Sequence, residues 1–225
     1  MKYAEIAHHL SRPRLNRYLA VCGDRRRAIR LYKGNLTIAQ AFHPLLGVLE
    51  VAFRNNLYEA VAVYFNDPNW IINQKRGFMA HSSLAGSKYA LRRQVESAER
   101  RIARNHHKIT SARVIAEQSF GFWTDLFEPH HYRLLGGSPI NTFSNLARGS
   151  QRNTVAHALH KVRKFRNRIN HNEPTILRGT AIDFARATNV YDTMIDIFDS
   201  LDSGLITFIK SLDKVNRTIS RVRNI

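Results

Sequence analysis

Apolar residues recur at intervals of three and four positions between Thr37 and Phe65, and this spacing constrains the fold more than any other feature. They are Ile38, Phe42, Leu45, Leu49, Phe53, Leu57, Val61 and Phe65. Such spacing places the side chains on one face of an α-helix, which then faces a core. We therefore predict a long core helix with a kink at Pro44, which ends at the turn residues Asp67-Pro68-Asn69.

Helical periodicity and helix-end signals mark most of the remaining chain, and we find no convincing alternating strand and no internal repeat. Ser11 and Gly23 frame a short helix with a proline in its first turn, and Asp24 caps a second helix that we expect to stop at Gly34. Further helices are predicted over residues 87–108, 111–129, 150–170, 180–201 and 204–221. Residues 66–86 are expected to form a loop-rich insertion, and residues 128–140 a loop. The sequence therefore predicts an all-α fold, as a single helical bundle over residues 1–225.

Charge is the strongest compositional signal in the sequence. Thirty-five Lys and Arg face seventeen Asp and Glu, which leaves a formal net charge of +18, and 26 of the 35 basic residues are arginines. A guanidinium offers a planar fork of donors that suits phosphate oxygens and can stack on bases, unlike an ammonium. The basic residues are concentrated in three blocks, 12–33, 88–113 and 152–178. We therefore expect a polyanionic partner, the alternative being a basic surface that serves solubility alone.

Several classes of protein are excluded or disfavoured. No segment approaches the ~18 uninterrupted apolar residues of a membrane span, and the N-terminus lacks the apolar core of a signal peptide. We therefore expect a soluble, cytoplasmic protein with no membrane partner. Cys22 is the only cysteine and the paired histidines are adjacent in sequence, so no disulfide and no metal site are expected. No glycine-rich phosphate loop, G-x-S-x-G or H-E-x-x-H motif occurs, and no cofactor is expected.

The stretch RKFRNRINHNEP, residues 163–174, gathers basic side chains, asparagines and one histidine at the end of a helix that must stop before Pro174. Within it Arg166 and His171 form an R-x4-H pair, and Asn167 lies on the same helical face as His171. Three other pairs share this spacing: Arg76/His81, Arg101/His106 and Arg152/His157. The spacing alone does not choose among them, and the last of these pairs, near a helix start, is the serious rival.

The residues of this stretch suit the metal-independent cleavage of RNA. A histidine can gain or lose a proton near neutral pH and could assist proton transfer at the 2′-hydroxyl or at the leaving oxygen. Arginine would stabilise the negative charge that gathers on the phosphate. Because DNA lacks the 2′-hydroxyl nucleophile, this chemistry would select RNA.

Several segments, taken in order, resemble the Abi (abortive infection) family of the HEPN superfamily. The N-terminal run holds an R-L…Y-L element, then A-x-x-L-Y-x-x-N, then a helix ending L-E-x-A-x-R-N. The segment FGFWTDLF is similar to the aromatic turn of that family. The stretch RNRINHNEP is similar to its R-N-x-x-x-H-N-E-P signature, a form of the HEPN R-x4-6-H motif. Together these segments cover most of residues 10–178.

The resemblance implies an all-α bundle of HEPN type and a metal-independent endoribonuclease, in phage-defence or toxin–antitoxin settings. It implies Arg166 and His171 as catalytic residues and Asn167 as the polar residue that follows the arginine, and it favours this pair over Arg152/His157. It also implies a homodimer that brings two motifs into one cleft, and RNA as substrate and as a structured inhibitory partner. The superfamily includes catalytically silent members that bind RNA or nucleotides, which is the alternative function for this chain.

Further polar residues are candidates for RNA binding or for supporting the catalytic pair. They are Glu50, Arg54 and Asn55 on the long helix, and Arg163, Arg168 and Asn170 around the motif. Glu50 and Arg54 are four residues apart and could instead form a buried ion pair that orders the bundle. His43 is expected to be a core histidine, and Trp70 and Trp123 are expected in the core rather than as platforms for base stacking.

Overall fold

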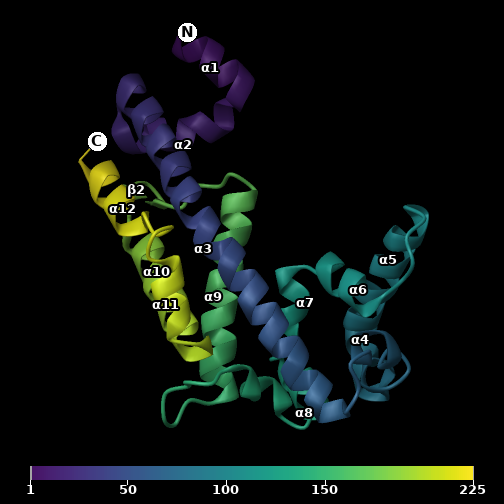
Figure 1. Ribbon diagram of the computed structural model, residues 1–225. Helices are drawn as coiled ribbons and strands as arrows, with labels where there is room; N and C mark the ends of the chain where they lie inside the picture. The colour runs from purple at the N-terminus through teal and green to yellow at the C-terminus, as the bar shows by residue number, and fades with distance from the viewer. Residues whose placement is uncertain (1, 225) are drawn as a thin grey trace. The chain divides into compact units, whose positions relative to one another are not determined.

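Helix α3 (Arg25–Phe65) is the longest element of the computed structural model, which describes residues 2–224 (Figure 1). The predicted apolar stripe is buried along it except at Phe65, which is half-buried, and Phe42, Leu45 and Phe53 are fully inaccessible to solvent. The helix passes through Pro44 without a break, at an exposed position. The prediction that a helix stops at Gly34 is wrong. The apolar stripe already begins at Ala28, so tertiary packing holds the glycine in a helix despite its cost of about 1 kcal/mol.

The all-α prediction is confirmed, since 73% of the residues are helical and 2% are in strands. Besides α3 the longer helices are α1 (Tyr3–Leu10), α2 (Arg12–Cys22), α5 (Ala90–Arg104), α9 (Arg152–Asn170), α10 (Ala185–Leu201) and α12 (Val215–Arg223). Short helices and 3-10 turns are α4 (Trp70–Asn73), η1 (Phe78–Ala80), η2 (Ser82–Ser87), α6 (Ser111–Glu117), α7 (Phe120–Asp125), α8 (Pro129–Leu134), η3 (Ser138–Thr142) and α11 (Gly204–Ile209). A small hairpin that periodicity did not predict pairs β1 (Leu177–Arg178) with β2 (Ala181–Ile182).

The contacts of the chain divide into two compact units. The first holds residues 1–49, 164–198 and 204–225, and the second holds residues 50–163 and 199–203. Buried side chains occur in both units, and the single bundle over residues 1–225 stays a prediction. The chain passes between the units within α3, α9 and α10, and once more immediately before α11.

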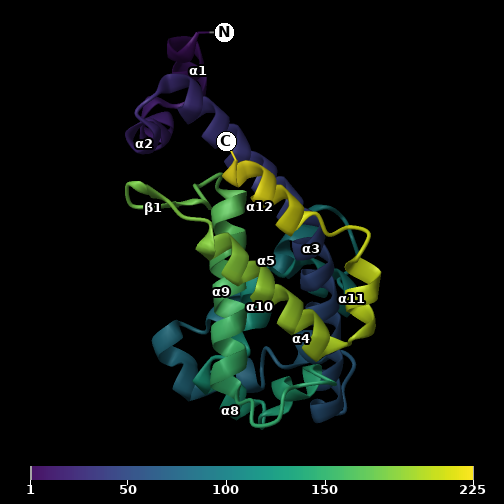
Figure 2. The same cartoon turned by 90° about the vertical axis from the view of Figure 1, so that its left-hand side faces the viewer.

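The core of the first unit is built around one aromatic contact between α3 and α9. The rings of Phe42 and Phe165 lie 4.7 Å apart between their centroids, and both side chains are buried. Near the N-terminus, Tyr18 of α2 packs edge-on against Tyr32 of α3, with centroids 5.3 Å apart. The hairpin follows α9 in the chain and is seen beside α12 in Figure 1 and below α1 and α2 in Figure 2.

The core of the second unit is an aromatic cluster around Phe53. Its ring centroid lies 5.9 Å from that of Phe120, 6.0 Å from Phe127 and 6.2 Å from Phe143. Trp70 and Trp123 are both buried, with centroids 6.4 Å apart, which confirms the prediction that the tryptophans belong to the core.

Residues 66–86, predicted as a loop-rich insertion, fold into α4, η1 and η2. Ile71 and Met79 are fully buried there, so this segment contributes to the core of the second unit. Similarly, residues 128–140 hold the short helix α8, and the predicted helix over residues 111–129 is divided into α6 and α7.

Helix α3 is long and apolar enough to cross a membrane by length and composition alone. The core helix of a soluble protein passes the same test, and Phe42 and Phe53 of α3 are fully buried inside the protein. The helix is therefore weak evidence and does not point to membrane insertion.

Phe53→Ala should lower the free energy of unfolding by about 3–5 kcal/mol, because it removes a ring that contacts three others and leaves a cavity. Denaturant titration followed by circular dichroism measures this. Val51→Ala is the matched control on the same helix, since Val51 is 46% exposed and its truncation should cost less than about 0.5 kcal/mol. Equal effects of the two substitutions would contradict the assigned core.

Candidate active site at the end of helix α9

Helix α9 forms because its apolar residues follow helical spacing and bury one face. These residues are Val155, Leu159, Val162, Phe165 and Ile169. The helix ends in a tight turn in which Asn172 adopts the left-handed conformation, with a φ of 52°. The N–H of Asn172 donates to the carbonyl of Ile169 at 2.9 Å, and the N–H of Glu173 donates to that of Arg168 at 2.8 Å. This pair of bonds is a Schellman motif, with asparagine in the place that glycine usually takes.

The predicted catalytic pair lies at this helix end. His171 is exposed immediately after the last residue of α9, and Arg166 is half-buried one turn earlier. The N–H of His171 donates to the carbonyl of Asn167 at 3.0 Å, which carries the helical register through the histidine. Five residues in that register rotate by about 140°, so the two side chains of one chain point in different directions.

The turn after the motif is held from helix α3 by Asn35, a buried amide with only 1% of its surface exposed. The Oδ1 atom of Asn35 accepts from the backbone N–H of Thr175 at 2.7 Å and from its hydroxyl at 2.8 Å. The Nδ2 atom of Asn35 donates to the carbonyl of Glu173 at 3.5 Å. Two segments that are about 140 residues apart in sequence are therefore joined by one side chain. Periodicity did not single out Asn35, which entered only as the last residue of the A-x-x-L-Y-x-x-N element.

Two other motif residues were predicted to bind RNA or to support the catalytic pair. Arg168 contributes to the turn, because its guanidinium lies 3.3 Å from the Glu173 carboxylate and its Nε donates to the carbonyl of Pro174 at 3.4 Å. Asn170 is exposed, as is Asn167. The polar face of this helix end is therefore open to a ligand while its backbone is fixed.

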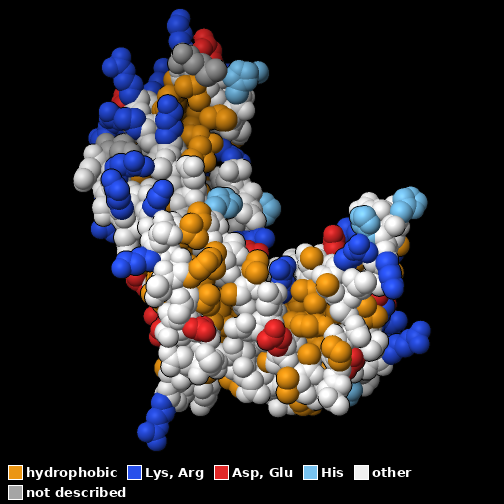
Figure 3. Space-filling model, viewed as in Figure 1, with side chains coloured by type: hydrophobic (Ala, Val, Ile, Leu, Met, Phe, Trp, Pro, Cys, Tyr) orange, Lys and Arg blue, Asp and Glu red, His pale blue; other side chains and the backbone are white. Residues whose placement is uncertain are grey.

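A small cleft of about 220 Å³ adjoins the turn and brings in two arginines that sequence reasoning did not select. Arg14 and Arg17 of α2 line it, together with Asn172, Glu173 and Pro174. Both belong to the first basic block, and Arg14 is also the arginine of the R-L…Y-L element, but neither signal indicated that they lie beside the motif. In Figure 3, Lys and Arg side chains (blue) gather over the helices near the N-terminus, where that block lies.

The other predicted site residues belong to the second unit. Arg163 forms an ion pair with Asp125 at 2.5 Å and donates to the Thr124 hydroxyl at 3.0 Å. Arg54 is half-buried and its Nε donates to Oδ1 of the exposed Asn55 at 3.4 Å. Glu50 is half-buried.

The prediction of a core His43 is wrong, because His43 is exposed. Its neighbour Phe42 occupies the apolar stripe, and a step of one residue turns the helix by about 100°, away from the core.

The rival pair Arg152/His157 lies in the second unit and has a different environment. The Arg152 guanidinium donates to the carbonyl of Phe127 at 2.8 Å and also bonds Asn153, so it ties the helix start to a neighbouring segment. His157 is exposed. Of the remaining pairs, Arg101 is bound to Glu117 at 2.7 Å.

Within residues 2–224, no group of three or more His, Cys, Asp or Glu side chains is arranged to hold a metal ion. Comparison of the chain with protein-family models, with curated proteins and with solved structures finds no match.

Asn35→Ala should lower the free energy of unfolding by about 2–6 kcal/mol, because it leaves two buried donors of Thr175 without an acceptor, at about 1–3 kcal/mol each. Hydrogen exchange should also show lost protection of the Thr175 amide. Asn16→Ala, at an exposed asparagine of α2 in the same unit, is the control and should change neither quantity by much. Retained protection of the Thr175 amide in the Asn35 variant would refute the role of Asn35 in holding the turn after α9.

Proposed function

We propose that this chain is a metal-independent endoribonuclease that cuts single-stranded RNA through Arg166 and His171, with Asn167 in support. The observation that supports the proposal most is an exposed histidine on a fixed turn, flanked by basic residues of the motif and by Arg14 and Arg17 of the adjoining cleft. Single strands are favoured over duplexes because their bases can be stacked and their edges can be contacted.

The reaction would use the RNA's own 2′-hydroxyl. As that oxygen attacks the adjacent phosphorus, the P–O bond to the 5′-oxygen of the next nucleotide breaks, leaving a 2′,3′-cyclic phosphate and a free 5′-hydroxyl. His171 would transfer a proton at the attacking or the leaving oxygen, and Arg166 would stabilise the charge on the phosphate oxygens.

The divergence of Arg166 and His171 within one chain favours a composite site. A two-fold axis near the end of α9 would bring both copies of the motif to one phosphate and would make the interface isologous. The proposed enzyme is thus a homodimer, in the cytoplasm. A phage-defence or toxin–antitoxin role, with a structured RNA as inhibitor, follows from the resemblance to the Abi family.

A second candidate function is a noncatalytic RNA- or nucleotide-binding module. The divergence of Arg166 and His171 favours this function as well, because the two side chains of a single chain do not point to one phosphate. The two candidates differ in whether the His171 imidazole is needed for an effect on RNA beyond binding.

His171→Ala should reduce cleavage of a single-stranded RNA by about 10²–10⁴-fold while RNA binding persists, because the imidazole moves a proton and adds little to affinity. Cleavage is followed by gel electrophoresis in excess EDTA, with the product tested for a 2′,3′-cyclic phosphate. His157→Ala, from the rival pair, should remain active. An inactive His157 variant beside an active His171 variant would assign the chemistry to the rival pair Arg152/His157 and refute this proposal. Activity that needs added magnesium would exclude the metal-independent mechanism.

Mixed dimers should test the shared site. If each cleft needs an arginine from one chain and a histidine from the other, mixing inactive Arg166→Ala chains with inactive His171→Ala chains should restore part of the activity. The oligomeric state at micromolar concentration is measured by light scattering. A fully active monomer would refute the composite site.

A further inference from the structure

A groove of about 350 Å³ with a mixed apolar and polar lining lies between α3 and α12 in the first unit and is not part of the site at the end of α9. Its α3 wall consists of Thr37, Gln40, Ala41 and Pro44, which are spaced to share one helical face. Asn35, which holds the turn after the motif, is rotated from this face by about 140–240°. The groove and the motif therefore use different sides of α3.

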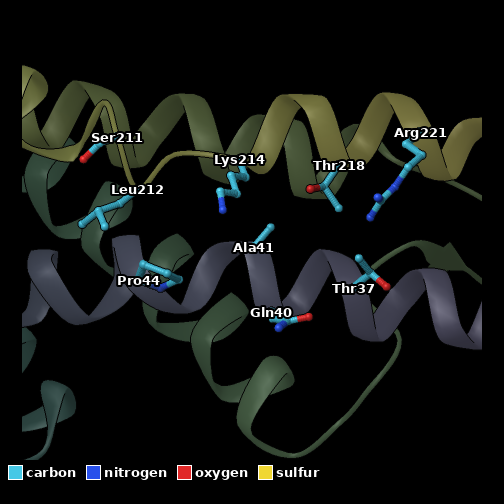
Figure 4. Close-up of a pocket in the computed structure, with 9 residues that line it drawn as sticks. All are labelled: Thr37, Gln40, Ala41, Pro44, Ser211, Leu212, Lys214, Thr218 and Arg221. Carbon is cyan, nitrogen blue, oxygen red and sulfur yellow. The ribbon is translucent and has the colours of Figure 1, made fainter.

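The opposite wall is basic. Lys214, the N-cap residue of α12, is followed at intervals of four and three residues by Thr218 and Arg221 of the helix, and Ser211 and Leu212 close the end of the groove. Figure 4 shows the Lys214 and Arg221 side chains reaching from the α12 side toward α3. Helix α12 itself contains no acidic residue.

The chemistry of the lining selects an anion. No carboxylate lines the groove. The nearest in sequence, Asp213, accepts from the Tyr191 hydroxyl at 2.5 Å and from the Val215 N–H at 2.9 Å. The Ser211 and Thr218 hydroxyls and the Gln40 amide add neutral donors to the two cations. Such a set of donors matches phosphate oxygens.

The lining also limits the kind of phosphate ligand. No aromatic side chain lines the groove, so a nucleobase would find no stacking platform there. The part of a nucleic acid that fits is the sugar–phosphate backbone, which needs cations and hydrogen-bond donors but no ring.

We propose that the α3/α12 groove is a second RNA-binding site, in which Lys214 and Arg221 hold backbone phosphates of a single strand away from the cleavage motif. This inference rests on the proposed action on RNA and adds to it a contact that positions the strand without touching the scissile phosphate.

The test measures the binding of a fluorescein-labelled, 2′-O-methylated twelve-nucleotide strand by anisotropy, since that strand has no 2′-hydroxyl to react. The double variant Lys214→Ala/Arg221→Ala should bind about tenfold or more weakly than the wild type. Its slope of log K against log salt should be shallower by about 1.4, or about 0.7 for each lost phosphate contact. Lys214→Arg/Arg221→Lys keeps both charges and should retain the affinity.

The matched control is Lys210→Ala/Arg217→Ala, which removes the same charge from exposed positions of the same unit that do not line the groove. It should weaken binding by less than about threefold. Equal losses of affinity in the two double variants would overturn the proposal that the groove binds RNA and would leave only a general effect of net charge. Melting temperatures of both variants confirm that they are folded.

Two further measurements complete the test. The first distinguishes RNA from small phosphate ligands, and the second distinguishes failure of the groove from failure of the proposed nuclease. If ATP or pyrophosphate binds the wild type but not Lys214→Ala/Arg221→Ala, while strand binding is unchanged, the RNA assignment is overturned. In cleavage assays the groove variant should raise KM and keep kcat. A wild type that binds the strand through the groove but never cleaves RNA would refute the proposed nuclease and leave the groove standing.

Discussion

Helix α3 supplies the constraint on which the rest of the structure depends. Its apolar stripe must be buried along nearly its whole length, and each unit of the chain does so with aromatic rings. In the first unit Phe42 packs on Phe165 of α9, and in the second Phe53 packs on Phe120, Phe127 and Phe143. Burial of such large rings contributes much of the stability of a core. In each unit the segments that pack on α3 are therefore those that bring an aromatic ring to this stripe.

One polar contact then converts packing into a positioned site. Burying the Asn35 amide costs free energy unless its hydrogen bonds are satisfied, and the backbone after α9 together with the Thr175 hydroxyl satisfies them. The turn that carries His171 is thus fixed on its buried side and open on the other. The backbone is fixed while the imidazole stays accessible, as the proposed proton transfer would require.

The large positive charge is distributed among different tasks. Some arginines act within the fold, as Arg163 does with Asp125 and Arg168 with Glu173. Arg14 and Arg17 adjoin the motif, and Lys214 and Arg221 line a groove on another face of α3. Net charge alone therefore overstates the number of cations that can meet a polyanion, and their positions decide which phosphate each could reach.

The sequence by itself determined the all-α class, the apolar stripe, the burial of both tryptophans and the end of α9 before Pro174, because these depend on local periodicity and backbone sterics. It did not determine that α3 continues through Gly34, that His43 faces solvent, or that Asn35 meets Thr175. Local patterns say which face of a helix is buried but not what covers it, and a contact across about 140 residues leaves no periodic trace. The tertiary structure alone placed Arg14 and Arg17 beside the motif and formed the basic groove, because both arise where segments distant in sequence pack together.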